Sequence, residues 1–164
     1  MAVAVAVLAA LGVVALVVFR SAAPAVAGWD LVEGPGFTVN LPAPASPGVV
    51  PGGRAHEETA VAGDRAYTVA WYGVNPSADP LAVLSSALHA LVGLPATVLH
   101  SHPAQTGPFA SVDVTARLPR DYLHGRILVV AARAYLVGEI TPEATPPADL
   151  TRLLAGFNPD PSAT

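Results

Sequence analysis

The chain has 164 residues, no cysteine, and a formal net charge of −4 from eight basic and twelve acidic side chains. The lack of cysteine excludes disulfides, thiolate nucleophiles and thiolate metal sites. A mildly acidic chain without a basic cluster has no electrostatic basis for binding nucleic acid, so we expect no nucleic-acid partner.

An apolar segment comes first. Residues 2–19 are eighteen consecutive apolar positions, closed by Arg20. A helix of that length spans about 27 Å, close to the ~30 Å hydrocarbon core of a bilayer. The sequence Ala25-Val26-Ala27 is typical of a signal cleavage site, although the segment lacks the basic start of a signal peptide. We expect residues 1–20 to be a transmembrane or signal segment, and a buried globular helix is the third alternative.

The remaining chain divides into a linker over residues 21–30, one domain over residues 31–158, and a disordered tail over residues 159–164. The α-amine of Met1 and the side chain of Arg20 put one positive charge on each side of the apolar segment, so the positive-inside rule does not decide the orientation. Our hypothesis is a single-pass protein of the cell membrane with an extracytoplasmic domain, secreted if cleavage follows Ala27.

Alternating patterns predict the first strands. Apolar residues alternate with polar ones from Phe37 to Leu41, which indicates a strand with one buried face. Residues 43–53 are rich in Pro and Gly, so we expect a loop there. The segments 56–62 and 65–74 flank Gly63-Asp64, which is typical of a hairpin turn. Both faces of the second segment carry large side chains, so both should be covered.

The middle of the chain predicts a helix and two strands. Asp79-Pro80 is a helix start, and Gly93 and Pro95 end the segment. Its apolar stripe is Leu81, Leu84, Leu88 and Leu91. Residues 96–101 and 109–118 are then predicted to be strands.

The end of the chain completes an α+β pattern. The continuous apolar run at 127–131 indicates a central strand, and residues 134–141 should pair back on it. A short helix should dock through Leu150, Leu153, Leu154 and Phe157. The order βββ-α-ββββ-α predicts an antiparallel sheet of about six to seven strands with two packed helices. The residues expected to be buried include Phe37, Leu41, Leu84, Leu88, Val129, Leu153 and Phe157.

Several short segments resemble the PsbP-like superfamily over roughly residues 36–158. They are Gly36-Phe37-Thr38-Val39-Asn40-Leu41-Pro42, Tyr67-Thr68-Val69, the hairpin from Gly125-Arg126 to Arg133-Ala134-Tyr135-Leu136-Val137, and Leu153-Leu154-Ala155-Gly156-Phe157. The resemblance implies an α/β/α sandwich and the role of an accessory subunit or partner-binding module, not an enzyme. No binding residue of the family has a counterpart in this sequence, so none is carried over.

One pair of histidines is the strongest candidate for chemistry. His100 and His102 are two residues apart, so on a strand they share one face and can chelate a metal ion. His56, His124 or Asp113 would have to complete such a site. An exposed strand end before Pro103 explains the pair equally well. We therefore expect no metal, cofactor or catalytic residue.

The other polar motifs have simpler explanations. Ser85, Ser86 and His89 fit an exposed helix flank, since no Gly-x-Ser-x-Gly elbow is present. His56-Glu57-Glu58 lacks the second histidine of a zinc-protease helix and is expected to be a solvated strand face. The glycine-rich tract at 48–53 lacks a phosphate-loop ending and is expected to be a loop.

The aromatic side chains leave two alternatives open. They either pack in the core or form a binding platform on an uncovered sheet face; they are Trp29, Tyr67, Trp71, Tyr72 and Tyr135. Trp29 follows the linker, so it either anchors at the lipid headgroups or starts the fold.

From the resemblance, we expect a membrane-tethered extracytoplasmic accessory or interaction domain that binds a protein or envelope component. One alternative is a lipid- or small-ligand-binding module, which an apolar cavity between sheet and helix would support. The other is a metal-binding protein or enzyme using His100 and His102, which converging His, Asp and Ser side chains would support.

Overall fold

The computed structural model describes residues 28–50 and 55–162. The predicted membrane segment at 1–20, most of the predicted linker and the cleavage sequence at 25–27 lie outside the described residues. No helix in the described part of the chain is long and apolar enough to cross a membrane.

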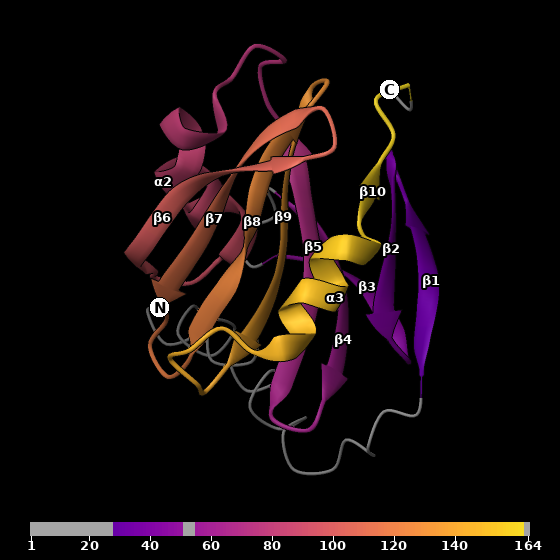
Figure 1. Ribbon diagram of the computed structural model, residues 1–164, viewed down its shortest axis with the longest axis vertical. Helices are drawn as coiled ribbons and strands as arrows, with labels where there is room; N and C mark the ends of the chain where they lie inside the picture. The colour runs from indigo at the N-terminus through magenta and orange to yellow at the C-terminus, as the bar shows by residue number, and fades with distance from the viewer. Residues whose placement is uncertain (1–27, 51–54, 163–164) are drawn as a thin grey trace, which may run out of the picture.

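A seven-stranded antiparallel sheet forms the centre of the molecule (Figure 1). Its strands lie in the order β3-β4-β5-β9-β8-β7-β6. Strand β9 therefore lies at the centre, between the group β3 to β5 and the group β6 to β8. The strands are β3 (Ala45–Val49), β4 (His56–Ala62), β5 (Arg65–Gly73), β6 (Thr97–Thr106), β7 (Phe109–Arg117), β8 (Tyr122–Val130) and β9 (Arg133–Thr141). Strands β3 and β6 are therefore its two edges.

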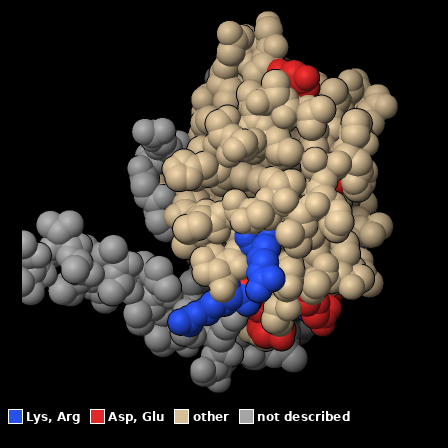
Figure 2. Space-filling view, turned by 90° about the vertical axis from the view of Figure 1, so that its left-hand side faces the viewer, with Lys and Arg blue, Asp and Glu red and all other residues tan. Residues whose placement is uncertain are grey.

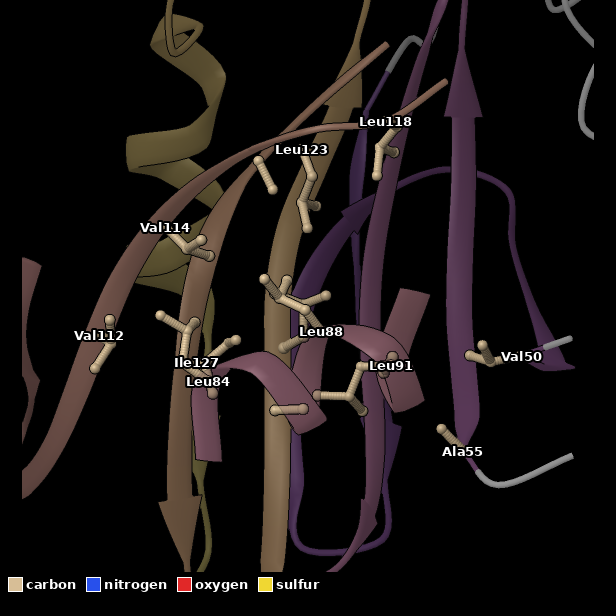
Figure 3. Close-up of a cluster of buried hydrophobic side chains, with 14 residues drawn as sticks. Val50, Ala55, Leu84, Leu88, Leu91, Val112, Val114, Leu118, Leu123 and Ile127 are labelled. Carbon is tan, nitrogen blue, oxygen red and sulfur yellow. The ribbon is translucent and has the colours of Figure 1, made fainter. Parts of the chain in front are cut away.

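Helix α2 (Pro80–Val92) covers one face of this sheet. The Asp79 carboxylate accepts a hydrogen bond from the Leu81 amide at 3.0 Å, and Gly93 ends the helix at φ 66°, as the sequence predicts. Figure 3 shows its leucines among the valines and isoleucine of β7 and β8. The buried stripe is Leu84, Ala87, Leu88 and Leu91. Leu81 was also predicted to belong to that stripe. It is 50% exposed, because it lies in the first turn of α2, before the buried leucines begin.

A small sheet and helix α3 (Ala148–Gly156) cover the other face. The small sheet has the order β1-β2-β10, with β1 (Trp29–Gly34), β2 (Phe37–Pro42) and β10 (Asn158–Pro159). Phe37 is at the centre of this layer, with its ring centroid 5.1 Å from that of Trp71 and 5.8 Å from that of Tyr135. The mixed α+β class with an antiparallel sheet and two helices is thus confirmed.

The aromatic residues pack in the core rather than on an open platform. Tyr67, Trp71 and Tyr135 are buried, and Tyr72 packs against the cluster under α2. Trp29 lies in β1, with its ring edge-on to Tyr67 at 5.5 Å and the Arg152 guanidinium 4.5 Å from its centre. It therefore starts the fold in this structure.

Further predictions about the described residues were wrong in detail. The expected loop at 43–53 contains strand β3, because an edge strand bonds on one side only and tolerates Pro47. A strand, β1, precedes the predicted first strand and includes Trp29 and Asp30 of the expected linker. Val129 is only partly buried, because it lies beyond Ile127 on the α2 face of β8 and does not belong to the cluster packed under that helix.

Candidate functional site

The face of the large sheet under α3 is covered unevenly. Helix α3 contacts β8 and β9, and β2 contacts β4 and β5. The half formed by β6 and β7 instead carries polar side chains. We call this region the β6–β7 polar face and define it by His100, His102, Asp113, Thr115 and Arg126.

An ion pair fixes the middle of the β6–β7 polar face. Arg126 on β8 binds both carboxylate oxygens of Asp113 on β7, with Nη2 donating to Oδ2 at 3.0 Å. The same guanidinium donates to the Gln105 carbonyl at 3.1 Å. The His102 Nε2 atom lies 3.6 Å from Asp113 Oδ2, so a fixed carboxylate faces one nitrogen of that ring.

The structure brings only part of the candidate metal set together. His100 and His102 share one face of β6, opposite Thr115 and Asp113. His124 is buried, with Nδ1 3.1 Å from the Thr115 hydroxyl and Nε2 3.0 Å from the Glu143 carbonyl. Both of its nitrogens are therefore engaged.

His56 is far from this face. It lies on β4 and stacks on Trp71 with ring centroids 5.8 Å apart, whereas β6 is at the opposite edge of the sheet. No three metal-binding side chains gather within residues 28–50 and 55–162 of one chain.

A buried polar cluster under α3 was missed by the sequence analysis. Glu139 on β9 is 0% exposed, and its Oε1 lies 3.4 Å from Arg65 Nη1. The same guanidinium reaches Glu143 at 3.3 Å and Asp149 at 3.7 Å. Tyr67 donates to Asp149 at 3.3 Å. The sequence does contain a sign of its burial, because Glu139 follows Tyr135 and Val137 at every second position and therefore lies on the same buried face of β9.

Burial dominates the electrostatics of this cluster. It raises the pKa of Glu139 to about 7, although the nearby Arg65 charge acts in the opposite direction. Neither carboxyl oxygen has a hydrogen-bond partner among the described residues. Because Glu139 is fully covered, it does not meet a substrate in this structure. The cluster instead joins α3 to the sheet through Arg65.

The described residues of the layer under α2 are closely packed. Leu84, Leu88 and Leu91 fill the space between this helix and the sheet (Figure 3). An open hollow lies elsewhere, at the β1–β2 turn beside β10. Ser85, Ser86 and His89 are exposed on α2, as the helix-flank interpretation predicts.

Strand β6 is the most exposed element of the large sheet. Eight of its ten residues are exposed, including Val98 at 38% and Leu99 at 43%. It contains no Lys, Arg, Asp or Glu. Figure 2 shows the side on which β6 and α2 lie; most of that surface is uncharged, and charged side chains gather mainly near its lower edge. The sequence predicts this strand only for residues 96–101, with its end before Pro103, whereas β6 continues through Pro103 to Thr106.

No family model matches the chain, and no curated protein matches it. The PsbP-like resemblance therefore stays a prediction. What the protein binds has to be inferred from its own geometry.

Proposed function

We propose that this chain is a membrane-tethered, extracytoplasmic accessory domain that binds a protein or another envelope component and is not an enzyme. Residues 1–20 provide the tether, and the free edge of β6 provides the binding surface. The α/β/α arrangement of the PsbP-like superfamily is compatible with the two helices on opposite faces of the sheet. This proposal assigns the chain to that superfamily.

The exposed edge of β6 carries the proposal. An edge strand presents unpaired backbone N–H and C=O groups that template another strand, and proteins usually shield such edges with charges, bulges or short length. The other edge, β3, has only five residues and contains Pro47. Strand β6 has no Lys and, beyond an irregularity between Val98 and His100, pairs regularly with β7 from His100 to Thr106, so it is the edge that can accept a partner strand.

Photo-cross-linking from β6 tests this assignment. A photoreactive residue replaces Gln105 in the full chain in its native membrane, and the matched control replaces Ser85 on the exposed flank of α2. We expect covalent adducts from position 105 and none from position 85. Equal labelling from both positions, or none from either, would contradict binding at β6.

A backbone variant sharpens the test. Ser101→Pro removes one N–H from the middle of β6, and a proline is tolerated where its nitrogen faces a free edge. We expect this variant to keep its melting temperature and to lose most of the adducts from position 105. Undiminished adducts would show that the partner does not pair with the backbone of β6.

Thiol labelling tests the orientation. Because the chain has no cysteine, Ser162→Cys provides a single thiol near the exposed end of the domain. In intact cells it should react with a membrane-impermeant maleimide. Reaction only after lysis would place the domain inside the cell.

A further inference from the structure

The hairpin between β6 and β7 determines which backbone groups face the free edge. Gly107 and Pro108 form a two-residue turn closed by the pair Thr106 and Phe109. In such a hairpin the closing pair is hydrogen-bonded, and the pairs alternate along the ladder back to His100, beyond which the register shifts. The N–H and C=O groups of Ser101 and Gln105 therefore face outward. Pro103 falls at an outward position too, where its missing N–H costs the ladder nothing.

These observations fit one partner strand particularly well. We propose that β6 pairs antiparallel with β6 of a second copy, centred on Ser101, and that His100 and His102 of both copies bind one divalent transition-metal ion such as Zn²⁺. This inference rests on the proposed role of β6 as the binding edge. It identifies the partner as another copy of this chain.

The pairing is centred on Ser101 because that residue has both outward groups. Ser101 then exchanges two hydrogen bonds with Ser101 of the second copy, as in a hydrogen-bonded antiparallel pair. If the two-fold axis passed through His102 instead, Ser101 of each copy would face Pro103 of the other. The hydrogen bond from the N–H group that proline lacks would then be lost. The Ser101 register alone places His100 of each copy opposite His102 of the other.

This register gathers four imidazoles on one face. Directly opposite residues lie on the same side of a sheet, with Cβ atoms about 4.5–5.5 Å apart. Residues two apart on one strand are separated by about 6.7 Å. Four rings at the corners of such a rectangle can turn their nitrogens toward one point. Zinc favours four tetrahedral ligands at about 2.0–2.1 Å from nitrogen.

A supporting carboxylate is already in place. Asp113 Oδ2 lies 3.6 Å from Nε2 of His102, and Arg126 holds that carboxylate from the other side. A carboxylate beside one ring nitrogen keeps the proton there and leaves the other nitrogen free for a metal ion. Only half of the ligands belong to one chain.

The composition of β6 permits this pairing. The strand has no Lys, Arg, Asp or Glu to repel its own copy. Val98 and Leu99, which are 38% and 43% exposed, lie at the register shift of β6, next to the proposed contact of His100 to His102, and would lose exposed surface. A two-fold axis through Ser101 uses the same surface on both copies, as closed dimers do.

Metal-dependent association is the first test. The full chain, purified in detergent, is analysed by sedimentation equilibrium with Zn²⁺ and with a chelator, and bound zinc is counted. We expect a dimer with one zinc ion for two chains, which dissociates with the chelator. The His100→Ala, His102→Ala variant should lose this response, while the His89→Ala control keeps it. Asp113→Asn should weaken zinc affinity by about 10- to 100-fold.

Disulfide trapping tests the register. In a hydrogen-bonded antiparallel pair the two Ser101 Cα atoms would be about 5.5 Å apart, within the range of a disulfide. Ser101→Cys should therefore cross-link two chains under mild oxidation in the presence of Zn²⁺. The control Ser85→Cys should not cross-link.

The outcomes separate this inference from the broader proposal. Adducts from position 105 with a different protein, from a chain that stays monomeric with Zn²⁺, would overturn the inference and support the proposed function. Metal-independent dimers would overturn the metal site. No adduct, no cross-link and no zinc response would overturn both proposals.

Discussion

The two faces of the seven-stranded sheet are covered by different chemistry. Under α2 the buried residues are mainly aliphatic, with Leu88, Val114 and Ile127 at the centre. Under α3 and the small sheet, aromatic rings pack beside the buried carboxyl group of Glu139. One face should therefore depend on apolar burial at any pH, whereas the stability of the other should vary with protonation.

Phe37→Ala should have the largest effect. The ring is 2% exposed and packs against Trp71, Tyr135 and Phe157. Removing a buried phenylalanine should lower the free energy of unfolding by about 3–5 kcal/mol. Equilibrium urea unfolding measures this loss. A loss below about 1 kcal/mol would show that the aromatic layer contributes little to stability.

Leu88→Ala tests the face under α2. The side chain is 3% exposed, so its removal should cost about 2–5 kcal/mol in urea unfolding. The matched control is Leu81→Ala, because Leu81 is on the same helix and 50% exposed. The control should change stability by less than about 0.5 kcal/mol. Equal effects would mean that the helix packs through a different stripe.

Glu139→Gln tests the pH dependence of the face under α3. Burial raises the pKa of Glu139 from 4.5 to about 7 in the folded state, so the folded protein holds this proton more tightly than the unfolded chain. Its contribution to stability is therefore greatest below pH 4.5 and falls as the pH rises through 7. The total change in the free energy of unfolding is at most about 3.4 kcal/mol.

The measurement compares unfolding free energies between pH 4.5 and 8. Wild type should lose stability across this range, and Glu139→Gln should lose less. The other titratable or charged groups that face the Glu139 carboxyl are present in both proteins. They are Arg65 and Tyr67 on β5, His124 on β8, and Glu143 and Asp149 near α3. Leu88→Ala is the control and should lower stability equally at both pH values. A wild-type slope retained in Glu139→Gln would contradict this assignment.

Arg152→Ala should have the smallest effect. The guanidinium lies 4.5 Å from the centre of the Trp29 ring, and a cation–π contact at an exposed site contributes about 0.5–1 kcal/mol. Thermal unfolding should then compare Arg152→Lys with Arg152→Met, because both side chains keep an unbranched stem and only lysine keeps a cation. A cation–π contact makes the lysine variant the more stable of the two, whereas simple packing makes them equal.

Periodicity predicted the elements that have one clearly buried face. Strand β2 and helix α2 follow this rule, since Phe37, Val39 and Leu41 alternate and the leucines of α2 repeat every turn. Strand β3 could not be found in this way, because its side chains are mostly exposed and Pro47 and Gly48 oppose a strand. Tertiary pairing on one side outweighs those local preferences.

The candidate site was predictable only in part. The spacing of His100 and His102 was enough to place them on one face. The proximity of Asp113 to His102 required the register of the β6–β7 hairpin, which the turn at Gly107 determines. The contact between Arg65 and Glu139 forms because β9 lies beside β5. It could not be predicted, because the sequence pattern within each strand does not show which strands are neighbours.

The short edge strand β3 limits how far such a protein can assemble. Two copies joined at β6 would leave only β3 at the ends of the combined sheet. Because β3 has five residues and Pro47 lacks an N–H, a third molecule would find no long template there. Association at β6 would end at a finite particle instead of growing into a fibre, so an exposed strand remains compatible with solubility.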